Sequence, residues 1–122
     1  MTTVLLIEDD DLLCRAFKRS LELRGVTTIQ ASSVEEGQRL FHAHRDSLDA
    51  IVMDGCLNSP NLNTLPLIKE IKDSGFAQPI IAASGDPKNR RIMMAHGCTH
   101  AVDDKTEIIS FTLRLLKEAG KL

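Results

Sequence analysis

Carboxylate side chains directly follow two short apolar segments, and they are the residues best suited to chemistry. Glu8, Asp9 and Asp10 come after the apolar residues 4–7, and Asp54 comes after a second such segment. Both segments have the pattern of strands buried on both faces, as in a parallel sheet covered by helices. In open sheets of this kind, binding sites form outside the carboxyl ends of the strands. We therefore expect three or four carboxylates to meet at one edge of a sheet.

Carboxylates gathered at one edge repel one another unless a cation lies among them. Hard oxygen ligands in such a crevice suit Mg²⁺, which keeps several waters and often also binds a phosphate oxygen. The acids alone therefore predict a magnesium-dependent phosphoryl site. Asp10 and Asp11 have a simpler interpretation, because acids just before a helix cap its N-terminus.

The composition is typical of one globular domain, spanning residues 1–122 and long enough to bury a core. The net charge of −2 gives no reason to expect nucleic-acid or membrane binding. No apolar stretch is long enough to span a membrane, and the N-terminus lacks a secretion signal. Cys14, Cys56 and Cys98 have no metal-binding spacing. We expect free thiols in a reducing, cytoplasmic location.

Strand and helix patterns alternate along the chain. Strands are expected at residues 4–7, 26–31, 48–54, 80–84 and 100–103. Helices are expected to end near residues 24, 44, 74, 96 and 119. The first helix is expected to begin after a cap at Asp10 or Asp11, the second at the capping box that Ser33 opens, and the third after a cap at Thr64. The fourth is expected to follow the turn 85–87, and the fifth to begin near Thr106. Residues 55–63 are rich in turn formers and are expected to form a loop.

Alternation of this kind, with right-handed crossovers, gives an α/β fold with a parallel sheet between two layers of helices. At this length the flavodoxin-like (βα)5 sandwich with strand order 2-1-3-4-5 is the natural solution. That order places the carboxyl ends of the first, third and fourth strands side by side. Glu8, Asp9, Asp54 and Ser84 are therefore expected to share one crevice.

The pattern resembles the receiver domain of two-component response regulators, in the manner of chemotaxis regulators, over essentially the whole chain. Four segments carry the resemblance. They read VLLIEDD at residues 4–10, DAIVMD at 49–54, PIIAASG at 79–85 and AHGC at 95–98. Each segment alone is a weak signal, but all four occur in order at the ends of the expected strands.

The resemblance implies that Asp54 is the phosphoacceptor, which takes a phosphoryl group from a histidine on a sensor kinase or phosphotransfer protein. Asp9 and Asp54 then bind Mg²⁺ directly, with the backbone carbonyl of Cys56 as a third ligand. Glu8 acts through a water on the metal, and the Ser84 hydroxyl binds a phosphoryl oxygen. A carboxylate is a competent nucleophile once a metal neutralises the phosphoryl group.

The resemblance also implies a signalling module and not an enzyme. Its partners are the kinase and a downstream effector protein or fused output domain, with no direct contact to nucleic acid or membrane. The output surface of the family is the face made by the fourth helix, the fifth strand and the fifth helix. The sequence leaves open whether the chain stands alone or belongs to a larger regulator or hybrid kinase.

The end of the fifth strand departs from the family pattern. Receivers carry a Lys there that pairs with the phosphoryl group, followed by Pro. The usual spacing from Gly97 leads to Asp104, while Lys105 lies one residue later and Thr106 stands in place of Pro. Either a bulge brings Lys105 to the site or the site lacks this cation. We favour Lys105, since edge strands tolerate bulges.

Two further departures concern switching. The family's aromatic residue in the fifth strand is replaced by Ala101 or Val102, and the loop after Asp54 is longer than usual and carries Asn58, Asn61 and Asn63. These departures keep a second hypothesis open, a pseudo-receiver that acts as a protein-interaction module with weak or no phosphorylation.

Unrelated enzymes fit the sequence less well. A flavodoxin-like flavoprotein needs a hydroxyl- and Gly-rich phosphate loop after the first strand, where this chain has acids. A haloacid-dehalogenase-type phosphatase needs an Asp two residues after its nucleophile, where this chain has Cys56. Glycine-rich nucleotide-binding motifs are absent as well.

Overall fold

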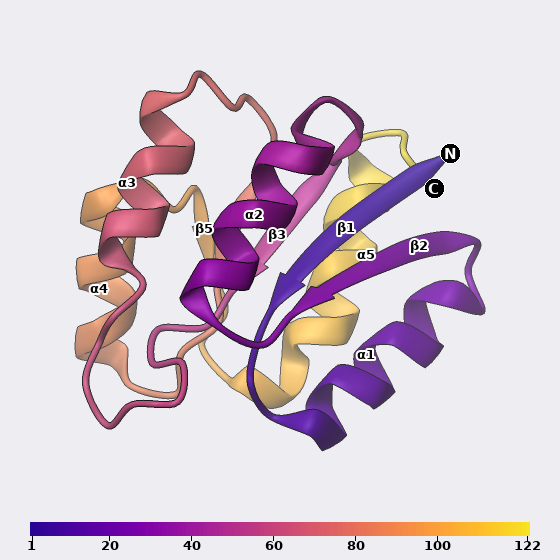
Figure 1. Cartoon of the computed structure of the whole chain (residues 1–122). Coiled ribbons are helices and arrows are strands. Elements are labelled where there is room, and N and C mark those ends of the chain that lie inside the picture. Colours follow the sequence, from indigo (N-terminus) through magenta and orange to yellow (C-terminus); the bar gives the residue numbers. More distant parts are fainter.

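Five parallel strands form a single sheet that lies between two layers of helices (Figure 1). The computed structural model describes residues 1–122. The sheet order is β2-β1-β3-β4-β5, which confirms the predicted fold class and strand order. The strands are β1 (Thr2–Ile7), β2 (Val26–Ala31), β3 (Ala50–Met53), β4 (Ile80–Ala82) and β5 (His100–Ala101).

The helices divide between the two faces of the sheet. They are α1 (Asp11–Glu22), α2 (Val34–His44), α3 (Leu65–Asp73), α4 (Pro87–His96) and α5 (Ile108–Glu118). Side chains of α1 and α5, such as Phe17 and Leu116, share one buried cluster. Side chains of α2, α3 and α4, such as Phe41, Ile68 and Met93, share the other. None of these helices is long and apolar enough to cross a membrane.

The inner strands carry uninterrupted apolar runs, residues 4–7 of β1 and all of β3, because both of their faces are covered. In β1, Val4 and Leu6 pack into the cluster under α1 and α5, whereas Leu5 and Ile7 pack into the opposite one. Successive side chains of a strand point to opposite faces, so each face takes every second residue. The uninterrupted apolar run before Glu8 is the direct consequence.

Side chains just outside the helices set where several of them begin. Asp10 Oδ1 accepts a hydrogen bond from the Leu13 amide at 3.2 Å and caps α1. Ser33 Oγ accepts from the Glu36 amide at 3.1 Å, and Glu36 Oε1 accepts from the Ser32 amide at 2.9 Å. The predicted capping box therefore forms, with its return bond one residue further upstream.

Several predictions about element ends were wrong. The first strand begins at Thr2 and not at residue 4, and the third covers Ala50–Met53 and not residues 48–54. The fourth strand covers Ile80–Ala82 and not residues 80–84, and the fifth covers only His100–Ala101. The last helix starts at Ile108, after a short 3-10 turn at Lys105–Glu107. Thr64 precedes α3 but makes no capping hydrogen bond with its side chain. Its hydroxyl bonds to the backbone of the preceding loop instead, as described below.

We expect Gly97→Ala to destabilise the protein by about 2–4 kcal/mol. Gly97 ends α4 with φ of +141°, and a Cβ there would lie 3.0 Å from the Lys72 Cβ of α3. Gly25→Ala is the matched control, since Gly25 also has positive φ, +79°, but no atom within 4 Å of its Cβ position. Urea unfolding should show a loss of about 1 kcal/mol for the control. Equal losses would mean that the close approach of α3 and α4 at Gly97 carries no cost.

Candidate functional site

Three carboxylates lie together at the carboxyl ends of β1 and β3. One oxygen from each of Glu8, Asp9 and Asp54 lies within 4.8 Å of the others. The two strands pair in register, with Ile7 opposite Met53. The Asp54 amide then donates to the Ile7 carbonyl at 2.9 Å. The ladder continues one residue beyond β3 and so holds the Asp54 backbone beside β1.

Asp54 is held through its side chain and through its backbone. The residue is 7% exposed, and its Oδ1 accepts a hydrogen bond from the Gly55 amide at 2.8 Å. Thr64 Oγ1 lies 2.9 Å from the Asp54 carbonyl and 3.1 Å from the Gly55 carbonyl. We had assigned this buried hydroxyl to a helix cap. No local pattern identifies its partner, because that partner lies ten residues earlier.

Lys105 lies among the acids. Its Nζ is 2.7 Å from Glu8 Oε1 and 3.3 Å from Asp54 Oδ1, and its side chain is 30% exposed. Of the two arrangements that the sequence left open, the structure has the one in which Lys105 reaches the acids.

The chain brings Lys105 inward by a route other than the bulge that we predicted. The paired residues of β5 are in regular register with β4, with Ala82 opposite Ala101. The strand ends there, and the 3-10 turn begins at Lys105. Asp104 is exposed and caps this turn, because its Oδ1 accepts from the Thr106 amide at 2.9 Å. The acid that the usual spacing places at the site is therefore exposed and bonded to Thr106 in its own turn.

Burial and charge shift the acid–base properties of this group. Burial, assisted by the negative charge of Asp54, raises the pKa of Glu8 to about 7 against the opposing hydrogen bond from Lys105. Burial alone lowers the pKa of Lys105, but its bond to Glu8 and the charge of Asp54 outweigh burial and raise it. The lysine therefore stays an ammonium ion. A single cation is shared between two buried carboxylates.

Asp9 differs from the other two acids because it is exposed. Its Oδ2 accepts a hydrogen bond from the Asn58 amide at 2.8 Å. Burial alone would raise the pKa of the Asp9 carboxyl group, but the bond from Asn58 and other hydrogen bonds to Asp9 outweigh burial and lower it. Asp9 is therefore the ionised carboxylate on the solvent side of the cluster.

Ser84 lies at the end of β4, next to the loop that follows Asp54. The residue is 6% exposed, and its Cβ is 3.7 Å from the position that a Gly55 Cβ would take. Its Oγ accepts from the Asp86 amide at 3.2 Å, and its carbonyl accepts from Arg90 Nη1 at 2.7 Å. The predicted crevice between the ends of β1, β3 and β4 therefore has this hydroxyl at its β4 side.

The loop 55–63 is held by its asparagines. Asn63 bonds to Leu57 twice, with its Oδ1 accepting from the Leu57 amide and its Nδ2 donating to the Leu57 carbonyl, both at 2.8 Å. Asn58 has φ of +53° and bonds to two neighbouring loops. The sequence indicated that these asparagines shape the mouth of the site but did not identify their partners.

The cysteines are all free thiols. Cys14 and Cys98 are buried, and Cys56 is half-buried two residues after Asp54. Burial and the nearby charge of Asp54 raise the pKa of Cys56. Its thiol is therefore a poor nucleophile.

Ala101 and Val102 face opposite sides of the sheet. Val102 is buried in the core beneath α1 and α5. Ala101 is half-buried on the other side and borders a hollow of about 410 Å³ together with Arg90 and Met94 of α4. Of the two residues, Ala101 is therefore the small side chain at the edge of an open groove.

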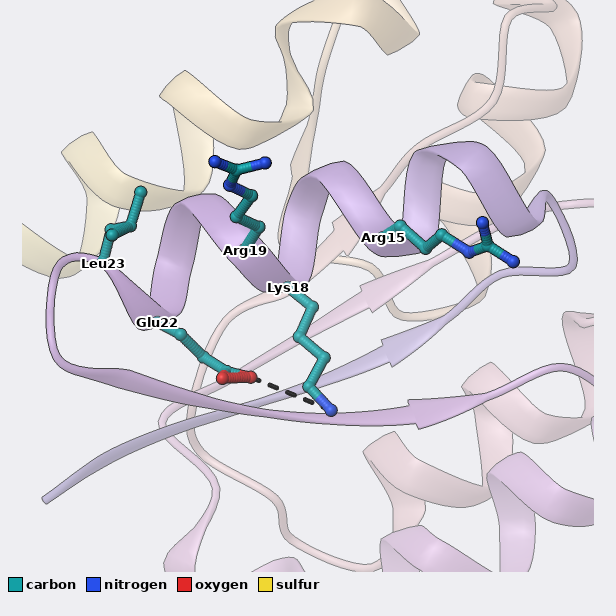
Figure 2. Close-up of a pocket in the computed structure, with 5 residues that line it drawn as sticks. All are labelled: Arg15, Lys18, Arg19, Glu22 and Leu23. Atoms are coloured by element: carbon teal, nitrogen blue, oxygen red, sulfur yellow. Dashed lines mark ion pairs between the residues drawn. The ribbon is translucent and has the colours of Figure 1, made fainter.

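Two other hollows differ in their relation to the acids. One of about 190 Å³ is lined by Asp10, Leu13, Lys105 and Thr106, beside the cluster. A larger one of about 470 Å³ lies along α1, where Lys18 and Glu22 form an ion pair at 3.8 Å (Figure 2). The larger hollow contains none of the clustered acids. The site is therefore identified by the cluster of carboxylates and not by the size of a hollow.

The three carboxylates fit a hard divalent cation. All the side-chain donors are oxygens, two of the residues are buried, and the third opens to solvent. Mg²⁺ prefers such sets, since it binds through a few carboxylates and retains waters for the remaining positions. No thiol or imidazole belongs to the cluster, so softer metals are disfavoured.

Comparison with known proteins gives a weak sequence match and strong structural ones. No protein-family model matches the chain. The autoinducer 1 sensor kinase/phosphatase LuxN of Vibrio campbellii is 29% identical over 92 residues, which are 75% of this chain. The match spans only about 10% of the length of LuxN, and LuxN of Vibrio harveyi matches equally.

Among solved structures, the similarity extends over nearly the whole chain. A Francisella receiver domain gives a TM-score of 0.77 at 22% identity, covering 98% of this chain and 99% of that one. A Clostridium thermocellum receiver domain gives 0.78 at 22% identity, with 98% of each chain covered.

A third structure adds a detail about its own site. A Burkholderia pseudomallei response regulator, described with a phosphorylated aspartic acid and a calcium ion, gives a TM-score of 0.80 at 23% identity. The similarity covers 95% of this chain and 66% of that one. The chain therefore has the fold of response regulator receiver domains, as its sequence predicted.

Proposed function

We propose that residues 1–122 form a receiver domain of a two-component phosphorelay, which accepts a phosphoryl group on Asp54 from a phosphohistidine of a sensor kinase or phosphotransfer protein. The observation that carries the proposal is the cluster of Glu8, Asp9 and Asp54 with the Lys105 ammonium beside two of them. Carboxylates this close to one another repel, so their clustering at a sheet edge costs free energy. A phosphoryl site that binds a cation accounts for this costly arrangement.

The cation in this proposal is Mg²⁺. Asp9, Asp54 and the backbone carbonyl of Cys56 would hold it, and it supplies positive charge for the oxygens of the phosphoryl group. Glu8 is fully buried and bonded to Lys105 at 2.7 Å. Its role is therefore indirect, through water at the metal and through the orientation of Lys105.

Asp54 is the nucleophile in this proposal. Its Oδ1 is engaged by the Gly55 amide and Lys105, so we assign the attack on phosphorus to Oδ2. The new P–O bond forms as the P–N bond of the phosphohistidine breaks. The electron pair of the P–N bond stays with the imidazole, which takes a proton from solvent.

Lys105 and Ser84 bind the phosphoryl oxygens. Lys105 can turn its ammonium from Asp54 toward the added group, since its side chain is partly exposed at the edge of the cluster. Ser84 presents a hydroxyl at the neighbouring strand end. Two different chain segments supply these donors, since Ser84 follows β4 and Lys105 begins the turn after β5.

The partners follow from the transfer. The similarity to LuxN, a sensor kinase/phosphatase, supports a histidine kinase system as the source of the phosphoryl group. The output is a protein effector or a linked output domain that contacts the face of α4, β5 and α5. Three free thiols fit a cytoplasmic location.

One observation favours a second function, an interaction module that is not phosphorylated. Ala101 offers no aromatic side chain through which Ser84 could act on the α4–β5 groove. The two functions differ in whether Asp54 accepts a phosphoryl group, and a single mass measurement separates them.

We expect the protein to gain one phosphoryl group when incubated with acetyl phosphate and Mg²⁺. Intact-mass spectrometry should show this adduct in the native chain and in Asp103→Asn, a control that removes an exposed acid near the same sheet edge. Asp54→Ala should show none. A folded native protein without an adduct, in the presence of Mg²⁺, would support the interaction module instead.

We expect Lys105→Met to lower the free energy of unfolding of the metal-free protein by about 1–3 kcal/mol at about pH 8. Removing the ammonium leaves buried carboxylates without a counter-charge. A raised carboxyl pKa means that the folded form is favoured when the acid is protonated. The loss should therefore be largest above the Glu8 pKa of about 7, where the carboxylate is ionised, and should shrink as the pH falls below it and Glu8 takes up a proton.

Urea unfolding at a series of pH values measures this loss. Lys88→Met is a control, because Lys88 is exposed on α4 and forms no ion pair. Added Mg²⁺ should recover part of the stability of Lys105→Met. A loss that does not depend on pH would mean that Lys105 acts through packing of its methylene groups and not through its charge.

A further inference from the structure

Asn58 joins three loops at the mouth of the site. Its backbone amide donates to Asp9 Oδ2 at 2.8 Å, and its side-chain Nδ2 donates to the Ser32 carbonyl at 2.9 Å. Asp9 follows β1, Ser32 follows β2, and Asn58 belongs to the loop after β3. One residue therefore connects the three chain segments that leave neighbouring strands at the same end of the sheet (Figure 1).

The backbone of Asn58 is suited to this connection. Its φ of +53° makes it the one residue other than glycine with positive φ. Asn tolerates this conformation better than other side chains, because its short amide can bond locally. Here that amide bonds to Ser32 in another loop, which fixes the backbone amide of residue 58 in the direction of Asp9.

The contact with Asp9 engages one of its two oxygens. With Oδ2 accepting from Asn58, the other oxygen, Oδ1, is available to a cation. Asp9 is exposed, so no packing fixes its rotamer, in contrast to the buried Glu8 and Asp54. Outer groups that orient a carboxylate ligand in this way tune metal affinity.

We propose that Asn58 is a positioning residue for Mg²⁺, which holds Asp9 with one oxygen toward the cation by fixing the loop after β3 to the Ser32 carbonyl. This inference rests on the proposed magnesium site and adds a determinant of its affinity. The residue touches neither the phosphoryl group nor the metal. It acts on the one acid of the cluster whose direction is not set by burial.

The test is Mg²⁺ titration of Asn58→Gly by isothermal calorimetry. Glycine accepts the positive φ and keeps the backbone amide but removes the bond to Ser32. We expect Mg²⁺ binding to weaken roughly three- to tenfold. The amide proton of residue 58, followed by NMR in the metal-free protein, should move upfield as its bond to Asp9 loosens.

Asn61→Gly is the matched control. It adds the same flexibility to the same loop, and Asn61 bonds through its backbone amide only, at 3.1 Å to Ser59 Oγ. Its Mg²⁺ affinity should stay within about twofold of the native value. Equal weakening in both variants would overturn the inference, because loop flexibility would then be sufficient.

Two further results separate this inference from the proposed function. Native protein that binds Mg²⁺, with loss of binding in Asp9→Asn, supports the site itself. If the site binds and Asn58→Gly binds equally well, the positioning role of Asn58 is wrong and the site stands. If the native protein does not bind Mg²⁺, both are wrong. The thermal midpoint of metal-free Asn58→Gly should stay near that of Asn61→Gly, since a purely structural role would lower it.

Discussion

The structure depends on how repulsion among carboxylates at adjacent strand ends is balanced. Glu8 and Asp54 are both buried, and burying two neighbouring carboxylates is costly without a counter-charge. Lys105 provides that charge from the far end of the chain. The sheet order brings the acids together, and the turn after β5 brings the cation to them. The site is therefore complete only when the last β–α connection is in its folded position.

The fold was largely predictable, because its signals are local and repeated. An apolar segment such as 4–7 must be covered on both faces, and helical spacing between such segments leaves few topologies. Asp10 and Ser33 cap their helices as their types predict. The clustering of the acids followed from strand order alone.

The details that escaped prediction are those set by partners far away in the sequence. The Thr64 hydroxyl bonds to a carbonyl ten residues upstream. Lys105 reaches the acids from a 3-10 turn that Asp104 caps. From the sequence we predicted a bulge in the fifth strand instead. Asn58 bonds to two loops that only the folded sheet brings near it. Single-residue propensities do not contain such contacts, which tertiary structure decides.

The loop after β3 is closed at its base. The Thr64 hydroxyl bonds to the carbonyls of Asp54 and Gly55. The backbone amide of Asn63 donates to the Gly55 carbonyl at 3.0 Å. Hydrogen bonds at its base therefore hold both ends of this segment. The segment is therefore suited to variation in length and to the grafting of a foreign loop. Either change can alter the entrance to the crevice while the backbone of Asp54 keeps its position.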